Sequence, residues 1–265
     1  MRIDPIEMTI QTLQRNEQRL FPLGSVSGVR YSSRDIEDTR QQLDAILERD
    51  KHFTSATQTN PSVFHIGRYL LTQSQEFEVQ GPLTGGEAEV VAIRVDGDVF
   101  ITVGSDQCDR ELDPLFPDKP KQMCPHPVAA VAWPYSEVQE HWDSLRIYSH
   151  VVAGTHTVPL QDSELSELVD LDYLLETEDI GKLADPIILF CGSVAFLDSA
   201  AETVERHSLP KETAKGVGEE FHIRLHDPVL DRTIEHRYRA VPLGDELHER
   251  RDALGLAMYH PNPPA

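Results

Sequence analysis

The sequence predicts an α+β protein that consists mostly of strands, with helices at its edges. Three short stretches alternate apolar and polar side chains as strands do, at residues 76–79, 89–95 and 98–103. An Asp96-Gly97 pair, which favours a tight hairpin turn, joins the last two. The chain has 265 residues, of which 39% are hydrophobic, enough for one large domain or two small ones.

The first 30 residues show no clear period, and the clearest helical pattern of the N-terminal part follows them. Residues 8–20 are compatible with a short helix, and residues 34–51 carry apolar side chains at helical spacing behind a serine that can cap them. We therefore expect residues 1–60 to form a segment with one helix, packed on a main domain of residues 61–265.

The second half of the chain is predicted to alternate helices with strands after a Pro-rich loop. Residues 134–145 are predicted to form a helix with Val138, Trp142 and Leu145 on one stripe, and residues 162–183 an acidic amphipathic helical region. The remaining strand-like stretches are residues 146–153, 155–160, 186–190, 221–226 and 234–241.

Composition excludes several classes of partner. The net charge is −21, from 24 basic and 45 acidic residues, and nucleic acids and anionic membranes both require a cationic surface. No apolar stretch reaches the ~18 residues of a membrane span, and the first residues lack the apolar core of a secretory signal. We expect a cytoplasmic protein. The acidic excess fits either ordinary solubility or a salty cytoplasm.

The three cysteines, Cys108, Cys124 and Cys191, are widely spaced and odd in number. That arrangement is neither a disulfide framework nor a zinc knuckle. We expect packed thiols rather than nucleophiles, because buried cysteine behaves as a small hydrophobic residue. Glycine-rich phosphate-binding loops are also absent, so the sequence does not support nucleotide binding.

Three carboxylates form the most informative pattern. If the chain is extended from Glu87, then Glu87 and Glu89 point to the same face. Asp106 lies 17 residues after Glu89, which is enough for a strand, a turn and a return strand past Gly104. Carboxylates brought together repel one another unless a cation neutralises them, and a hard divalent metal prefers oxygen ligands. The alternative is two exposed acids on a strand and a third acid in a turn.

Five segments occur in the order found in one known superfamily. They are Glu87/Glu89, the stretch from Ser105 to Leu112, Lys121-Gln122-Met123-Cys124-Pro125-His126-Pro127, Cys191-Gly192-Ser193-Val194-Ala195 and Gly218-Glu219-Glu220-Phe221-His222-Ile223. From about Pro61 to Leu243 the chain resembles the fumarylacetoacetate hydrolase superfamily, and most closely its uncharacterised branch known as domain of unknown function 2848. The resemblance implies a mixed β-roll or sandwich with peripheral helices, and one Mg²⁺ or Mn²⁺ on Glu87, Glu89 and Asp106.

The resemblance also suggests roles for other residues. Arg110 and Lys121 match positions that hold a substrate carboxylate and polarise its carbonyl, and Ser193 and Gln107 are expected to bind the same substrate. His65 lies near the start of the main domain and is a candidate general base, with a purely structural role as the alternative. Met123 stands where relatives carry an acid, so the chemistry of this chain is expected to differ in part.

These residues predict a metal-dependent hydrolase or lyase that acts on a 2-oxo or 2,4-dioxo acid through a metal-stabilised enolate. Hydrolysis, decarboxylation, hydration and tautomerisation all remain open, because each passes through that enolate. The alternative function is a non-catalytic member of the fold that binds a metal or a ligand. We expect a homodimer whose partner molecule is a small oxo acid.

Overall fold

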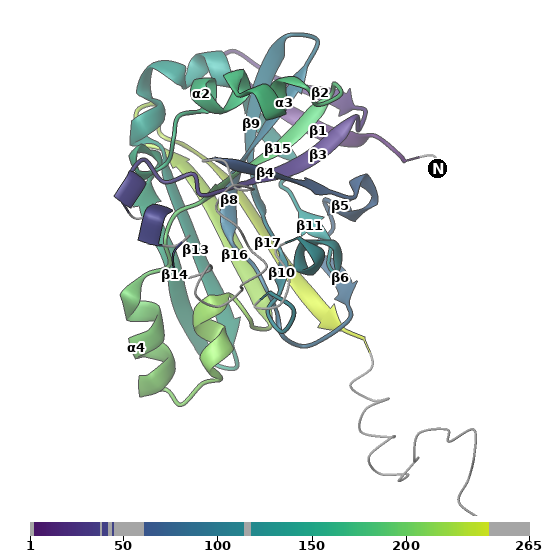
Figure 1. The fold of residues 1–265 in the computed structure, drawn as a ribbon. Coiled ribbons are helices and arrows are strands. Elements are labelled where there is room, and N and C mark those ends of the chain that lie inside the picture. Colours follow the sequence, from purple (N-terminus) through teal and green to yellow (C-terminus); the bar gives the residue numbers. More distant parts are fainter. Residues whose placement is uncertain (1–2, 38, 42–43, 45–60, 114–117, 244–265) are drawn as a thin grey trace, which may run out of the picture.

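The computed structural model describes residues 3–37, 39–41, 44, 61–113 and 118–243, which form two large sheets with helices around them (Figure 1). Strands dominate and helices are few, so the α+β class expected from the sequence is confirmed. Of the helix predicted at residues 34–51, only a few residues are described, and Ile36, Glu37, Thr39–Gln41 and Asp44 are helical among them.

The larger sheet has eight strands in the order β2-β1-β12-β9-β8-β15-β3-β4. Their bounds are β1 Ile6–Gln11, β2 Asn16–Phe21, β3 Ser25–Arg30, β4 Ser62–Ile66, β8 Ala88–Val95, β9 Asp98–Ser105, β12 Val131–Pro134 and β15 Ile187–Ser193. The β1/β12 and β15/β3 pairs are parallel, and the other pairs are antiparallel. Strands β1 to β3 come from residues 1–60, so the N-terminal segment contributes directly to this sheet.

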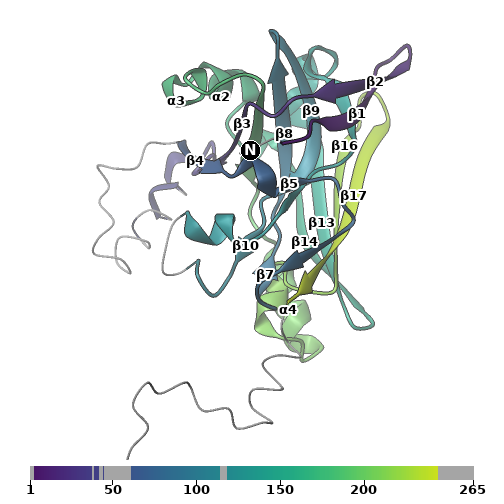
Figure 2. The same cartoon turned by 90° about the vertical axis from the view of Figure 1, so that its right-hand side faces the viewer.

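The smaller sheet has five strands in the order β14-β13-β16-β17-β6. Their bounds are β6 Glu76–Val79, β13 Arg146–Ala153, β14 His156–Glu164, β16 Glu220–Asp227 and β17 Arg232–Pro242. The two sheets lie against each other in Figure 2, and the larger hydrophobic cluster contains buried residues from both. A second cluster covers the other face of the eight-stranded sheet, with Val91 and Ile93 of β8 among its members.

Short elements complete the fold around the sheets. The helices are α2 Leu171–Glu176 and α3 Glu178–Gly181 beside β3 and β15, and α4 Asp198–Arg206 at the opposite end of the molecule (Figure 1). Two small sheets join β10 Cys108–Asp109 to β7 Thr84–Gly85 and β11 His126–Pro127 to β5 Leu71–Thr72. Short 3₁₀ helices lie at Arg68–Leu70, Lys119–Gln122, Tyr135–Glu137, Gln139–Ser144, Leu165–Glu167 and Lys211–Lys215.

The predicted hairpin is confirmed. β8 and β9 pair without a break from Val95↔Asp98 to Ala88↔Ser105. Asp96 and Gly97 both have positive φ, at 52° and 85°, as a two-residue turn between twisted strands requires. This hairpin forms the centre of the eight-stranded sheet and carries the candidate site at its open end.

Two of the helix predictions are wrong. Residues 8–20 form the β1/β2 hairpin, because Ile6, Met8 and Ile10 are buried at every second position, which is the period of a strand. Residues 134–145 form two short 3₁₀ helices separated by Val138, and the second is kinked at His141, whose φ of −129° is not helical. The stripe of Val138, Trp142 and Leu145 is nevertheless buried.

The helical region predicted at residues 162–183 begins later than expected. β14 continues to Glu164 and is followed by a 3₁₀ turn, and helix α2 starts only at Leu171 after its cap. The Asp170 side chain accepts a hydrogen bond from the Tyr173 N–H and caps α2. The other strand predictions are confirmed to within a few residues of their bounds.

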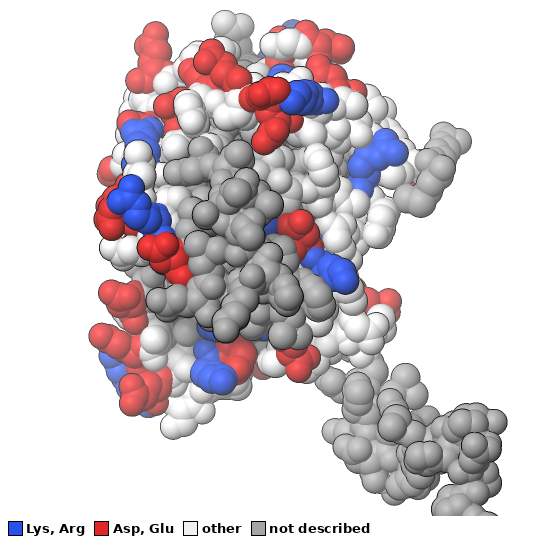
Figure 3. Space-filling model, viewed as in Figure 1, with Lys and Arg blue, Asp and Glu red and all other residues white. Residues whose placement is uncertain are grey.

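Acidic side chains are spread over the described face seen in Figure 3, with basic side chains scattered among them. No helix within the described ranges is long and apolar enough to cross a membrane.

Candidate metal centre

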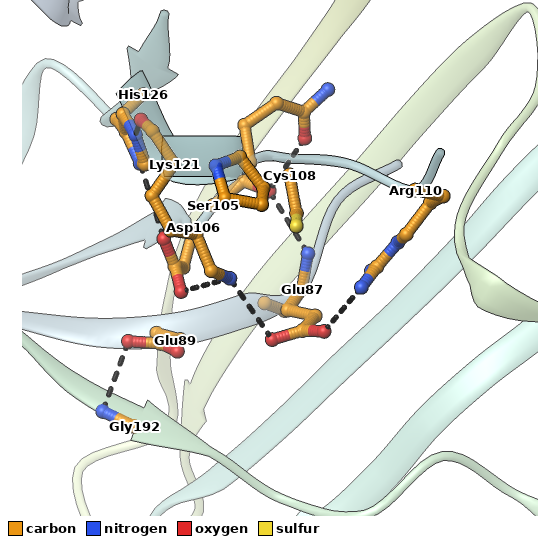
Figure 4. Close-up of polar contacts among 12 residues, drawn as sticks. Glu87, Glu89, Ser105, Asp106, Cys108, Arg110, Lys121, His126 and Gly192 are labelled. Atoms are coloured by element: carbon orange, nitrogen blue, oxygen red, sulfur yellow. Dashed lines mark hydrogen bonds and ion pairs between the residues drawn. The ribbon is translucent and has the colours of Figure 1, made fainter. Parts of the chain in front are cut away.

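The β8/β9 hairpin brings the three predicted carboxylates together. Glu89 pairs with Gly104 in register, and the Asp106 N–H donates to the Glu87 carbonyl oxygen at 3.0 Å. One carboxylate oxygen from each of Glu87, Glu89 and Asp106 lies within 4.8 Å of the other two (Figure 4). Glu89 shares its strand face with Val91 and Ile93, so the cluster lies on the face of the sheet away from the five-stranded sheet.

A bulge in β15 accommodates the most buried carboxylate. Glu89 is only 2% exposed, and its Oε2 accepts a hydrogen bond of 2.9 Å from the Gly192 N–H. The register between β15 and β8 shifts between Phe190 and Ser193, as expected where an extra residue bends a strand. Gly192 has a φ of +93°, which favours glycine, and the bulge aims its N–H at the acid. Ser193 then pairs with Glu89 in register.

Two cations from later in the chain face the carboxylates. Lys121 Nζ lies 2.5 Å from Asp106 Oδ2 and 3.8 Å from Glu87 Oε2. Arg110 Nη1 donates to Glu87 Oε1 at 2.9 Å. Both cations are almost fully buried, so the attraction is little screened by water. The fold therefore brings Glu87, Glu89, Asp106, Arg110 and Lys121 into one cluster (Figure 4).

The electrostatics of the three acids differ. Burial acts to raise the pKa of Glu87, but Lys121 and Arg110 together lower it below its ordinary value. Burial likewise acts to raise the pKa of Asp106, but Lys121 and His126 hold the pKa of that carboxyl well below its usual range. The pKa of Glu89 is raised well above its ordinary value by burial and by the nearby Asp106 and Glu87 carboxylates. Glu89 is thus the acid that most needs an added positive charge.

The guanidinium of Arg110 keeps an unused edge. Its Nη1 serves Glu87, whereas its Nε and Nη2 are buried and make no hydrogen bond to any described residue. These two donors point the same way from the planar group, which is the geometry that binds a carboxylate through two parallel bonds. The substrate-binding role that the resemblance implied for Arg110 stays a prediction.

Other predicted residues lie farther from the carboxylates. Gln107 is buried, and its Oε1 lies 2.8 Å from the Tyr238 hydroxyl and 3.2 Å from Ser105 Oγ. His65 does not contact the cluster: its Nδ1 lies 3.2 Å from Ser27 Oγ, and its carbonyl accepts a hydrogen bond from Gln122. Its side chain points to the strand face opposite Phe64, and the Phe64 ring is the one that faces Lys121.

Three contributors were not assigned a role from the sequence: the Gly192 N–H, the Tyr238 hydroxyl and the His126 ring. Gly192 lies in one of the five segments that carry the resemblance, but no role was predicted for its N–H, and no local pattern marks Tyr238. The only local feature of His126 in the sequence is the pair of prolines that flank it near Lys121. Its burial was not predicted, and it is fully buried.

The geometry can be set beside known proteins. The sequence matches a family described as Protein of unknown function (DUF2848) over residues 30–238. The chain belongs to the DUF2848 family. No curated protein matches its sequence.

Solved structures share the fold of this DUF2848 protein. A crystal structure of Cg1458 is 13% identical, covers 87% of this chain and 83% of its own, and has a TM-score of 0.53. A hexagonal crystal form of 2-keto-3-deoxyarabinonate dehydratase is 15% identical, with coverages of 86% and 78% and a TM-score of 0.54. That dehydratase complexed with magnesium and 2,5-dioxopentanoate has a TM-score of 0.53, with the same identity and coverages. The DUF2848 branch that the sequence resembled is thus confirmed as the family of this chain, and the solved structures confirm the fold.

Proposed function

We propose that Glu87, Glu89 and Asp106 hold one Mg²⁺ or Mn²⁺, and that this DUF2848 protein acts on a 2-oxo or 2,4-dioxo acid as a hydrolase or lyase. The observation that carries the proposal is the convergence of three carboxylates at the buried end of one hairpin, within 4.8 Å of one another. Carboxylate oxygens are the donors that these hard cations prefer, and the raised pKa of Glu89 marks a site short of positive charge. The residues present therefore fit a divalent cation.

A bound cation would supply Lewis acidity, which stabilises the enolate of an oxo acid. The chain's own residues would do the rest. Arg110 would hold the substrate carboxylate through its free Nε/Nη2 edge and keep Nη1 on Glu87. Lys121 would place its ammonium beside the substrate carbonyl, because its Nζ already lies between Asp106 and Glu87. The dehydratase with a similar fold is described with magnesium and a dioxo acid, which supports this class of ligand.

The metal site is tested by changing Glu89 to Ala and measuring Mn²⁺ binding by calorimetry. We expect tight binding in the unchanged protein and none in the variant, because one of three ligands is lost. Asp98→Ala is the matched control, since this acid lies at the other end of the same hairpin and its side chain is 66% exposed. Equal affinity in the unchanged protein and the Glu89 variant would show that the ion is not held here.

The substrate class is tested with oxalate as a probe and with a panel of 2-oxo and 2,4-dioxo acids as substrates. Arg110→Lys keeps the charge but loses the two parallel donors, so we expect weaker oxalate binding with Mn²⁺ affinity nearly unchanged. Turnover of an oxo acid should stop with EDTA and return with Mg²⁺ or Mn²⁺. A metal-loaded, folded protein that turns over none of the panel would favour the non-catalytic, ligand-binding function.

A further inference from the structure

His126 sits between the proposed metal site and the loop that carries Lys121. Its ring is completely buried, and the ring of Phe190 meets it edge-on with 5.6 Å between centroids. Nε2 lies 2.7 Å from the backbone carbonyl oxygen of Lys121, and Nδ1 lies 3.3 Å from Asp106 Oδ1 (Figure 4). One ring thus touches both the backbone of a proposed substrate-binding residue and the side chain of a proposed metal ligand.

Hydrogen-bond chemistry fixes what this ring can do. A backbone carbonyl only accepts, so Nε2 must carry the hydrogen in that contact. An ionised carboxylate also only accepts, so the Nδ1 contact to Asp106 is attractive when Nδ1 donates as well. Nδ1 and Asp106 Oδ1 are both buried and neither makes a hydrogen bond to any described residue, so the 3.3 Å between them is an ion-pair contact. Asp106 thus has His126 Nδ1 beside one carboxylate oxygen, and its other oxygen accepts a hydrogen bond from Lys121 Nζ.

The local sequence makes His126 a rigid support. Pro125 and Pro127 flank it and restrict the backbone on both sides. The segment also lies unusually close to β9, because Gly104 has no side chain: a Cβ at Gly104 would lie 2.7 Å from the Pro127 carbonyl oxygen. Gly104 in turn pairs with Glu89, so the support is built against the same hairpin end that carries the carboxylates.

We propose that His126 is a positioning residue that orients the Asp106 carboxylate toward the divalent cation through Nδ1, and this inference rests on the metal site of the proposed function. Partners that orient a ligand side chain from behind commonly change metal affinity by about 10- to 100-fold when they are removed. The competing possibility is that His126 acts only through Nε2, as an anchor for the Lys121 loop.

Two substitutions separate these roles. The amide nitrogen of asparagine falls near the position of a histidine Nδ1, and that of glutamine near Nε2. His126→Asn keeps a donor toward Asp106 and loses the bond to the Lys121 carbonyl, whereas His126→Gln does the reverse. We expect His126→Asn to bind Mn²⁺ within about threefold of the unchanged protein, and His126→Gln to bind it about 10- to 100-fold more weakly.

Mn²⁺ affinity is measured by titration calorimetry and by the loss of the free-ion signal in electron paramagnetic resonance. His141 supplies the matched control, because its Nε2 lies 3.0 Å from Asp227 Oδ1 in a pair outside the carboxylate cluster. His141→Asn and His141→Gln should leave Mn²⁺ affinity unchanged. Equal affinity in both His126 variants, or a weaker His126→Asn, overturns the positioning role. An unchanged protein that binds no Mn²⁺ overturns both this inference and the proposed function.

A measurement on the unchanged protein covers the case in which the variants do not fold. With ¹⁵N-labelled histidine, addition of Mg²⁺ should move the Nδ1 resonance of His126 more than its Nε2 resonance, because Nδ1 faces the carboxylate that binds the ion. An Nδ1 resonance that stays in place while calorimetry records Mg²⁺ binding overturns the inference.

Discussion

Two lysines make ion pairs of the same length in opposite surroundings, and this offers a sharp test of the site. Lys121 Nζ lies 2.5 Å from Asp106 Oδ2, and Lys182 Nζ lies 2.5 Å from Glu178 Oε1. The side chains of the first pair are 7% and 4% exposed, and those of the second are 66% and 82% exposed. Distance alone predicts equal contributions to stability, whereas burial predicts very different ones.

Replacing Lys121 by Met keeps most of the side-chain volume and removes the charge. Breaking one partner from a buried pair costs about 3–5 kcal/mol, because the remaining carboxylate stays buried without compensation. For a chain of this size, 1 kcal/mol corresponds to a shift of about 2–4 °C in melting temperature. We therefore expect Lys121→Met to lower Tm by on the order of 10 °C in EDTA. Lys182→Met should leave Tm unchanged, because water screens the exposed pair.

The assay is differential scanning calorimetry of both variants in EDTA and in excess Mg²⁺. A cation held by the three carboxylates replaces part of the missing charge. The loss of Tm in Lys121→Met, relative to the unchanged protein, should therefore shrink by at least half in Mg²⁺. The same loss of Tm in the two variants would refute the burial argument. A loss of Tm in Lys121→Met that is equal with and without Mg²⁺ would refute the inference that Lys121 lies beside the bound ion.

Three further outcomes follow from the geometry. Gly192→Ala should destabilise the protein by about 1–3 kcal/mol in urea unfolding, because a φ of +93° is strained for alanine, and it should weaken Mn²⁺ binding through Glu89. Gly181→Ala, with open space around it, should do neither. Burial lowers the pKa of His236 to about 4, so the unfolded chain takes up a proton that the folded one excludes, and stability should fall by about 3 kcal/mol from pH 6.5 to 4. His236→Phe should flatten that pH dependence in urea unfolding, and an unchanged slope would count against it. Burial raises the pKa of Cys108 to about 12, so iodoacetamide should not label the folded protein there, and Cys108→Ser should keep metal-dependent turnover.

The parts of the fold that the sequence predicted correctly are those with strong local signals. The β8/β9 hairpin combines alternating side chains with an Asp-Gly turn, and both signals lie within the hairpin itself. β2 gives no such signal, since its first five residues, Asn16 to Leu20, are exposed or half-buried. Its place is fixed by pairing with β1, and a pairing partner is not visible in a strand's own side-chain pattern.

The candidate site likewise has one part that local sequence signals indicate and another part that they do not. Glu87, Glu89 and Asp106 belong to one hairpin, so their spacing allowed them to converge, and the resemblance then favoured one site over exposed acids. The Gly192 N–H reaches Glu89 across 103 positions of the chain, and the Tyr238 hydroxyl reaches Ser105 across 133. Contacts of that kind depend on how distant strands pack, and neither periodicity nor spacing contains that information.

The way the carboxylates are held argues that the site is preorganised. A different segment fixes each acid: Arg110 after β10 holds Glu87, the β15 bulge holds Glu89, and Lys121 with His126 holds Asp106. Each support is buried and comes from outside the hairpin, so the acids cannot move apart without disturbing three separate packed elements. Ligands fixed in this way lose little freedom when an ion arrives. Substitutions in the supports should therefore weaken metal binding even where the three acids themselves are intact.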